Sequence, residues 1–359
     1  MKLSGNQLFW IMFCFQVHYA LIPALQYGKQ DAWLICLLSG AGVIVITCLI
    51  AQVSQLSPGD NLAEICRKLL GKWVGNLILL LYVVVWFFLT AVTLREWADY
   101  VYLKLLPGTP VSIVVLPMSL LLIYANLKGG IFAIGRCSQI IGPLYFLISF
   151  APVLLMFGIM DWTNLLPIYA DTGVHQIVKG AVPTLGNTMG GAMMPLMLTA
   201  FMQQPQQATK YAVRAMGLSS LWVLIAVLIS VLVLGSHLAP QLTLPWVVSI
   251  RSISILNFIQ NIDAIAVFVY SFSHFIALSA STFVTSYGLA QLIHKKLWKL
   301  MVVCVVGLSF LAVVLTSDVG HITNLYRDII WVRWVLPVNM IGIPLLLWII
   351  GKMKKEALQ

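Results

Sequence analysis

The stretch VPTLGNTMGGAMMP, residues 182–195, lies inside a hydrophobic run that extends from residue 177 to residue 202. Pro183 and Pro195 each lack a backbone N–H, and the glycines between them weaken helix formation. Backbone groups that lose their helical partners inside lipid must be buried in protein or line a wet cavity. The stretch therefore predicts a transmembrane helix that is broken in mid-membrane. The glycines at this break are Gly186, Gly190 and Gly191.

Polar side chains occur at the same depth, because Thr184, Asn187 and Thr188 lie within this stretch. Such a composition is typical of a discontinuous helix whose free ends bind a small ligand or ion. The backbone amides of residues 187–191 are expected to hold an anionic group, since the N-terminus of a half-helix offers free N–H groups and a positive dipole end. A glycine-rich packing surface for a neighbouring helix is the alternative, and the flanking prolines favour the break.

The composition is that of a polytopic membrane protein: 61% of the 359 residues are hydrophobic and only 9% are charged. With about 20 apolar residues per span, we predict an all-α fold of ten transmembrane helices in a single domain, residues 1–359. The expected spans cover residues 8–27, 32–56, 74–103, 111–126, 140–159, 177–202, 211–235, 262–293, 300–315 and 329–350.

The charges indicate an orientation. The chain carries a formal net charge of +10, and an alternating assignment of the loops places most lysines and arginines on the side of the two termini. The positive-inside rule then predicts that both termini are cytoplasmic. Because the positive-inside rule accounts for the basic net charge, we expect the lipid bilayer as a partner and no nucleic acid. Motifs for phosphate binding, metalloprotease chemistry, paired cysteines and a serine nucleophile are missing from the sequence, so we expect neither an enzyme nor a cofactor or metal.

The first span carries Gln16, His18 and Tyr19 at mid-membrane, with Pro23 one turn further on. This pattern predicts a second discontinuous helix, and a kink without unwinding is the alternative. If residues 8–159 and 177–350 are inverted repeats of five spans each, the broken helices are the first of each repeat, where transporters of this kind bind their substrates.

The third span has a polar face on which Trp86 and Thr90 lie four residues apart, and we expect this face to line a cavity. Further along, Arg95 and Asp99 are spaced to form an ion pair. Glu96 indicates either a polar, hydrated path or an ordinary interfacial charge. In the loop before this span, Asn61 and Glu64 have the spacing of a capping box, which predicts a short amphipathic helix.

The eighth span has the clearest polar stripe, which includes Tyr270 and His274, with Ser273 and Ala277 leaving room beside it. A charged group near mid-membrane costs several kcal/mol, so His274 is expected to be neutral and hydrogen-bonded unless the cavity is wet. It is either a hydrogen-bonded packing residue or a ligand- or proton-responsive one. Together with the two breaks and the third span, this stripe predicts a pocket between the first, third, sixth and eighth spans.

Short motifs are spread over nearly the whole chain: LSGNQLF at 3–9, LRE at 94–96, LPGTP at 106–110, GR at 135–136 and NID at 261–263. In this order and spacing they resemble the B subunit of nutrient germinant receptors in endospore-forming bacteria. That family belongs to the amino-acid/polyamine/organocation transporter superfamily.

The resemblance implies a transporter-like fold in the spore inner membrane and a receptor that binds a small nutrient germinant, expected to be an amino acid. It also implies partner proteins, a receptor A subunit and a lipoprotein C subunit, which receive the signal and start germination. An ordinary amino-acid permease is the alternative, because the same broken-helix pocket serves a carrier that cycles and a sensor that shifts between states.

Overall fold

The computed structural model describes residues 2–16, 21–169, 172–242, 244–253, 263–316 and 325–356. This part of the chain is almost wholly helical, and its only β pairing is an isolated bridge between Leu3 and Met202. Seven helical stretches in it are long and apolar enough to cross a membrane. They are Leu21–Ser54, Leu62–Leu103, Val111–Ile159, Pro205–Gln241, Tyr270–Leu292, Lys295–Leu315 and Ile329–Lys354. The protein is therefore a multi-pass membrane protein, as predicted, while the count of ten spans stays a prediction.

The first predicted span consists of two short helices, α1 (Gly5–Gln16) and α2 (Leu21–Gly28). At 1.5 Å per residue, neither reaches across a hydrocarbon layer of about 30 Å. His18 and Tyr19 lie outside the described residues, as does the side chain of Gln16. The chain continues through η1 (Lys29–Asp31) into α3 (Ala32–Ser54).

The sixth predicted span is interrupted where the sequence indicated. Helix α6 (Gly173–Thr188) ends before Met189, whose ψ of 2° is not helical, and the backbone continues as tight 3₁₀ turns and one short α-helical turn. These segments are η4 (Gly190–Met193), α7 (Pro195–Leu198) and η5 (Thr199–Phe201). Pro195 begins α7, but Pro183 lies inside α6 and does not end it. The break is thus set by the glycines and Pro195.

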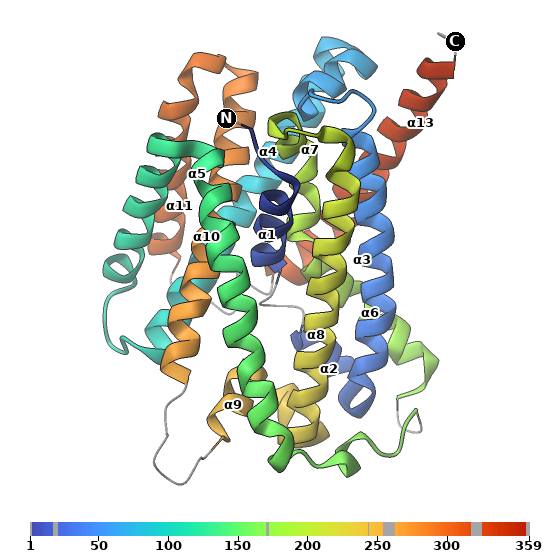
Figure 1. Cartoon of the computed structure of the whole chain (residues 1–359), viewed down its shortest axis with the longest axis vertical. Coiled ribbons are helices and arrows are strands. Elements are labelled where there is room, and N and C mark those ends of the chain that lie inside the picture. The colour runs from blue at the N-terminus through green and yellow to red at the C-terminus, as the bar shows by residue number, and fades with distance from the viewer. Residues whose placement is uncertain are drawn as a thin grey trace.

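Two glycines divide long helices into arms. Helix α4 (Leu62–Lys104) contains Gly71 at φ 81°, which separates a short first arm from the membrane-spanning arm. Helix α5 (Val111–Met156) contains Gly130 at φ 51°, and its ribbon turns back on itself (Figure 1). Both are left-handed conformations, which glycine adopts without strain. The predicted fourth and fifth spans lie on the two arms of α5.

The remaining elements complete the bundle, and one of them, η9, is a long π-helical run that contains Pro337 and precedes α13. In chain order they are η2 (Phe157–Ile159), η3 (Trp162–Leu165), η6 (Pro205–Gln207), α8 (Ala208–Leu238), η7 (Ala239–Gln241), α9 (Pro245–Arg251), α10 (Asp263–Leu292), η8 (Lys295–Leu297), α11 (Trp298–Leu315), η9 (Leu325–Gly342) and α13 (Ile343–Glu356).

The broken segments lie at the centre of the bundle. The largest buried apolar cluster combines side chains of α1, α3, α4, η4, α7, α10 and η9, among them Met12, Trp86, Met193 and Ile276. Large apolar side chains are exposed on the outer helices instead, for example Leu120 and Leu147 on the two arms of α5. An apolar exterior is what lipid-facing helices require. The start of α1 and the end of α13 lie at the same end of the bundle (Figure 1), which we call the basic end because Lys68, Lys295 and Lys354 meet there.

Candidate functional site

Four segments meet at the break in the sixth span. A Cβ added to Gly190 would lie 3.2 Å from Phe15 Cε1 on α1 and 3.6 Å from Leu89 Cδ1 on α4, so the bare glycine backbone packs against both helices. The neighbouring residue of α1 contacts the eighth predicted span: the Ser273 hydroxyl of α10 donates to the Cys14 carbonyl at 3.0 Å. We call this meeting of α1, α4, η4 and α10 the junction.

The carbonyl groups at the end of α6 are partly satisfied from outside the helix. Gly186 O accepts from the Trp331 indole Nε1 at 2.7 Å and from the Met189 amide at 3.2 Å. The hydroxyls of Thr184 and Thr188 donate to carbonyls of their own helix, Gly180 O at 2.8 Å and Thr184 O at 3.0 Å. These two hydroxyls are therefore satisfied within α6 itself. Asn187 is half-buried, and Gly191 is buried.

Trp86 is a fully buried indole on α4, one turn before Leu89. Its Nε1–H has no hydrogen-bond partner among the described residues, whereas its carbonyl accepts from the Thr90 hydroxyl at 2.8 Å. Its ring packs against Tyr82, whose hydroxyl donates to the Asn339 carbonyl of η9. A buried donor without a partner costs about 1–3 kcal/mol. The indole N–H is thus a polar group in the bundle centre that an acceptor would satisfy.

On α10, the eighth predicted span, the rings of Tyr270 and His274 contact each other, and Tyr270 also contacts Tyr100 of α4. His274 is almost fully buried, and its Nδ1 lies 3.0 Å from the Tyr270 carbonyl, which can only accept, so Nδ1 carries the proton. The Tyr270 ring lies 4.1 Å from the His274 ring and 4.1 Å from that of Tyr100 on α4. Ala277, one turn further on, is buried. This geometry holds the histidine in a fixed orientation and is compatible with the neutral form.

The predicted pair of Arg95 and Asp99 is present, with 3.0 Å between Arg95 Nε and Asp99 Oδ1. Arg95 also donates to two carbonyls at the end of α11, Val313 O at 2.8 Å and Thr316 O at 2.7 Å. Arg95 and Glu96 are both buried, so neither is a freely hydrated interfacial charge. The arginine is a cap for the C-terminus of α11, a role that sequence spacing did not indicate.

A second residue that the sequence did not single out is Asp31, which is fully buried. Its carboxylate accepts from the Tyr169 amide at 3.0 Å and from the Thr172 hydroxyl at 2.7 Å. These bonds tie the loop after α5 to the start of α3. An acidic residue directly before an apolar helix was the available signal, but it suggests a cap for α3, and the side chain makes no such bond.

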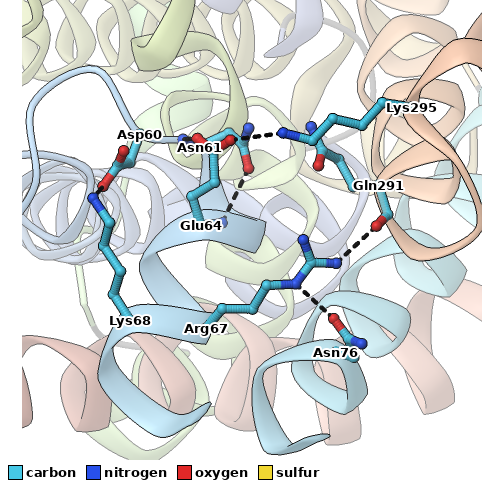
Figure 2. Close-up of polar contacts among 8 residues, drawn as sticks. All are labelled: Asp60, Asn61, Glu64, Arg67, Lys68, Asn76, Gln291 and Lys295. Atoms are coloured by element: carbon cyan, nitrogen blue, oxygen red, sulfur yellow. Dashed lines mark hydrogen bonds and ion pairs between the residues drawn. The ribbon is translucent and has the colours of Figure 1, made fainter. Parts of the chain in front are cut away.

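The basic end holds a polar cluster around the first arm of α4 (Figure 2). Asn61 and Glu64 form the predicted capping box, and Glu64 also pairs with Lys295 at 3.1 Å. Arg67 donates to Asn76 Oδ1 at 2.8 Å and to the Gln291 carbonyl at 2.7 Å, which joins this arm to the end of α10. The Lys354 ammonium on α13 donates to the Leu69 carbonyl at 3.0 Å.

Asp60 completes this cluster by pairing with Lys68. Burial opposes ionisation of Asp60, but hydrogen bonds from Lys68 and Ser57 and the Lys68 charge outweigh it and hold the pKa of this carboxyl below its ordinary value.

Comparison with known proteins decides the family. A sequence profile described as spore germination protein matches residues 2–319. The chain belongs to the spore germination protein family. It is 24% identical to spore germination protein KB of Bacillus subtilis over 361 residues, which cover 99% of this chain and 96% of that protein. It is 25% identical to spore germination protein YndE of the same species over 76% of this chain and 74% of the relative. The resemblance seen in the sequence is confirmed at the level of the family.

Solved structures show the fold of this family member to be that of transporters. Mhp1, a nucleobase-cation-symport-1 family transporter in a closed conformation with bromovinylhydantoin bound, superposes with a TM-score of 0.67 at 13% identity, covering 90% of this chain and 75% of that one. A manganese transporter of Eremococcus coleocola superposes with a TM-score of 0.59 at 10% identity, covering 97% and 76%. The family and the fold thus resemble permeases and transporters rather than enzymes.

Proposed function

We propose that this chain is the membrane subunit of a germinant receptor and that it binds a small nutrient, an amino acid, at the junction. The observation that carries the proposal is the meeting of η4 with α1 and α4 at Gly190, beside the bond that joins α1 to α10. Two of these helices also carry buried polar groups, the Trp86 indole N–H on α4 and His274 on α10. Family membership supports the role in germination, and the transporter fold supports a central ligand site.

In this proposal the ligand carboxylate is held by backbone amides at the break. Of residues 187–191, the amides of 187 and 188 lie within α6 and that of Met189 donates to Gly186 O, so the contact falls to Gly190 and Gly191. The remaining polar groups come from the other three segments. The proposed ligand-contacting side chains are Gln16, His18, Tyr19, Trp86, Thr90, Thr184, Asn187, Thr188, Tyr270, Ser273 and His274, with Gly186, Gly190, Gly191 and Ala277 leaving space. Gly190 is packed against Phe15 in this structure, so ligand entry requires the Phe15 side chain to move. A ligand that favours the displaced state shifts the population toward it, which is sufficient for a sensor.

The same proposal includes ten spans in two inverted repeats, residues 8–159 and 177–350, in the spore inner membrane with both termini on the cytoplasmic side. The positive-inside rule supports this orientation, since lysines gather at the end where α1 begins and α13 ends. The signal would pass to an A subunit and a lipoprotein C subunit.

A reconstitution experiment tests the proposal. The purified chain is placed in lipid nanodiscs, and its thermal stability is followed with a panel of amino acids, their carboxamides, sugars and nucleosides. A ligand that binds the folded state raises Tm in a concentration-dependent way. We expect an amino acid to do so and its carboxamide to be far weaker. Equal potency of acid and amide contradicts the carboxylate contact, and the lack of any stabilising nutrient contradicts the function.

The runner-up function is an amino-acid permease, which the likeness to transporter structures favours. Proteoliposomes loaded with the stabilising amino acid distinguish the two. A permease exchanges labelled amino acid across the membrane at a rate that saturates with concentration, and a receptor binds it without net exchange.

A further inference from the structure

A cavity opens at the basic end, and its lining includes none of the junction residues Phe15, Leu89 and Gly190. It has a volume of about 380 Å³ and lies between the turn of α5, the end of η5, the last turns of α10 and the start of α11. Its lining includes Lys128, Phe201, Phe283, Tyr287, Trp298 and Lys299.

The floor of this cavity is aromatic and well packed. The Phe201 ring meets those of Phe283 and Tyr287 edge-on at 5.4 and 5.2 Å, and the Phe283 ring meets Trp298 at 6.1 Å. These contacts hold the aromatic floor in place, because edge-to-face pairs at such distances are attractive. A rigid apolar floor suits an occupant with a hydrocarbon part.

The rim of the cavity carries two exposed lysines, Lys128 and Lys299. Neither forms an ion pair within the described part of the chain, although the nearby Lys295 pairs with Glu64 and Lys68 pairs with Asp60. Uncompensated ammonium groups beside an apolar floor attract an anion that is attached to a hydrocarbon chain.

The location narrows the occupant further. The cavity lies at the turn of α5 and the start of α11, next to a tryptophan and lysines, which is the composition of a membrane–water interface. Basic pockets between transmembrane helices on the cytoplasmic side bind anionic lipid headgroups. We propose that this cavity is a binding site for an anionic phospholipid, with Lys128 and Lys299 holding the phosphate and the aromatic floor contacting the acyl chains.

Such a lipid contacts two segments that also reach the junction, the broken sixth span and α10. Phe201 ends the broken sixth span, and its carbonyl accepts from the Leu3 amide at 2.7 Å, next to the start of α1. Phe283 and Tyr287 lie on α10, the helix that carries His274. A lipid in the cavity therefore holds the turn of α5 against α10 and against the end of the broken sixth span. It stabilises the packing of these three segments.

The test uses the full chain in detergent and native mass spectrometry with phosphatidylglycerol, or with phosphatidylcholine of the same acyl chains. We expect one phosphatidylglycerol to be retained and phosphatidylcholine to bind weakly. The double variant Lys128→Gln/Lys299→Gln should bind phosphatidylglycerol about thirtyfold more weakly, since a basic side chain near anionic lipid contributes about fivefold. Lys128→Arg/Lys299→Arg should retain the binding.

The matched control is Lys72→Gln/Lys210→Gln, which removes two other exposed lysines. Its affinity should equal that of the parent. Equal losses in the two glutamine variants, or equal binding of the two lipids, overturn the proposal in favour of unspecific charge attraction. Competition by glycerol phosphate at the concentration at which phosphatidylglycerol binds overturns it in favour of a soluble anion. None of these outcomes depends on the amino-acid panel, so the lipid site and the proposed function fail separately.

Discussion

The junction and the polar cluster at the basic end are both places where helices distant in sequence meet, but they are held together differently. At the junction, Gly190 packs its backbone against Phe15 and Leu89, and a hydrogen bond from Ser273 to the Cys14 carbonyl joins α10 to α1. In the cluster, charged side chains cross between α4, α10 and α13 and reach backbone carbonyls. Close packing around a glycine is sensitive to every added atom, whereas exposed ion pairs are screened and each contributes little. Packing at the junction is therefore the more sensitive of the two, while the cluster keeps the first arm of α4 in place.

The largest effect is expected from filling the junction. Gly190→Leu places a branched side chain where even a Cβ would lie 3.2 Å from Phe15 Cε1, so it should abolish the amino-acid response and leave membrane insertion intact. Gly307→Leu is the matched control, because a Cβ on Gly307 meets nothing within 4 Å. The measurement is the nutrient dose–response of spores that carry each variant. A normal response from Gly190→Leu would remove the junction from consideration.

The second-largest effect is expected at the buried indole N–H of Trp86. Replacing Trp86 with benzothienylalanine exchanges the N–H for sulfur and keeps the ring shape. We expect the stability of the unliganded protein to stay equal or rise, because an unpaired buried donor is removed, and the ligand affinity to fall by about tenfold, the value of one lost hydrogen bond. Calorimetry and ligand titration measure both. If affinity is unchanged, the indole is a packing group alone.

A smaller effect is expected at His274, whose ring is fixed by its bond to the Tyr270 carbonyl. His274→Gln keeps a hydrogen-bonding side chain but cannot titrate. If the protonated ring attracts the ligand carboxylate, affinity weakens as pH rises, and the variant flattens that dependence while retaining some binding. Ligand titrations across the neutral pH range decide the matter. The parental pH profile in the variant would assign His274 a packing role and direct attention to His18 or Glu96.

The smallest effect is expected in the cluster. Because the pKa of Asp60 is lowered from its ordinary value of 3.8, the stability from its pair with Lys68 is present above that value and is lost as pH falls through the folded-state pKa. Lys68 is 61% exposed, so Asp60→Asn should cost at most about 1 kcal/mol at pH 7 and should reduce the loss of Tm below pH 5. A loss of more than about 2 kcal/mol in the free energy of unfolding would contradict the small contribution expected of an exposed ion pair.

Sequence patterns predicted the features whose cause is local. Gly190, Gly191 and Pro195 break the sixth span because the backbone itself cannot continue as an ideal helix, and Asn61 with Glu64 forms a capping box within one turn. Pro183 was wrongly given a part in the break, because it lies inside α6 and a proline is tolerated within a membrane helix when neighbouring groups compensate.

Features that depend on tertiary contacts were not accessible from the sequence. Arg95 caps α11, which is more than 200 positions away in the chain, and Trp331 donates to Gly186 across 145 positions. Asp31 binds a loop that begins after the fifth predicted span. Spacing along one helix predicts which residues share a face, as it did for Arg95 and Asp99, but it cannot identify a partner from another helix. The assignment of ligand-contacting residues remains a proposal for the same reason.

Hydrogen–deuterium exchange of the peptide that spans residues 182–195 tests whether the backbone at the break holds the ligand carboxylate. The purified chain is labelled with and without a saturating amount of the amino acid that raises its Tm, and the carboxamide of that amino acid serves as the control. If the carboxylate is held by the amides of Gly190 and Gly191, which follow the end of α6, these amides become strongly protected with the amino acid and much less so with the carboxamide. Unchanged exchange in this peptide, together with protection elsewhere in the chain, would contradict the account.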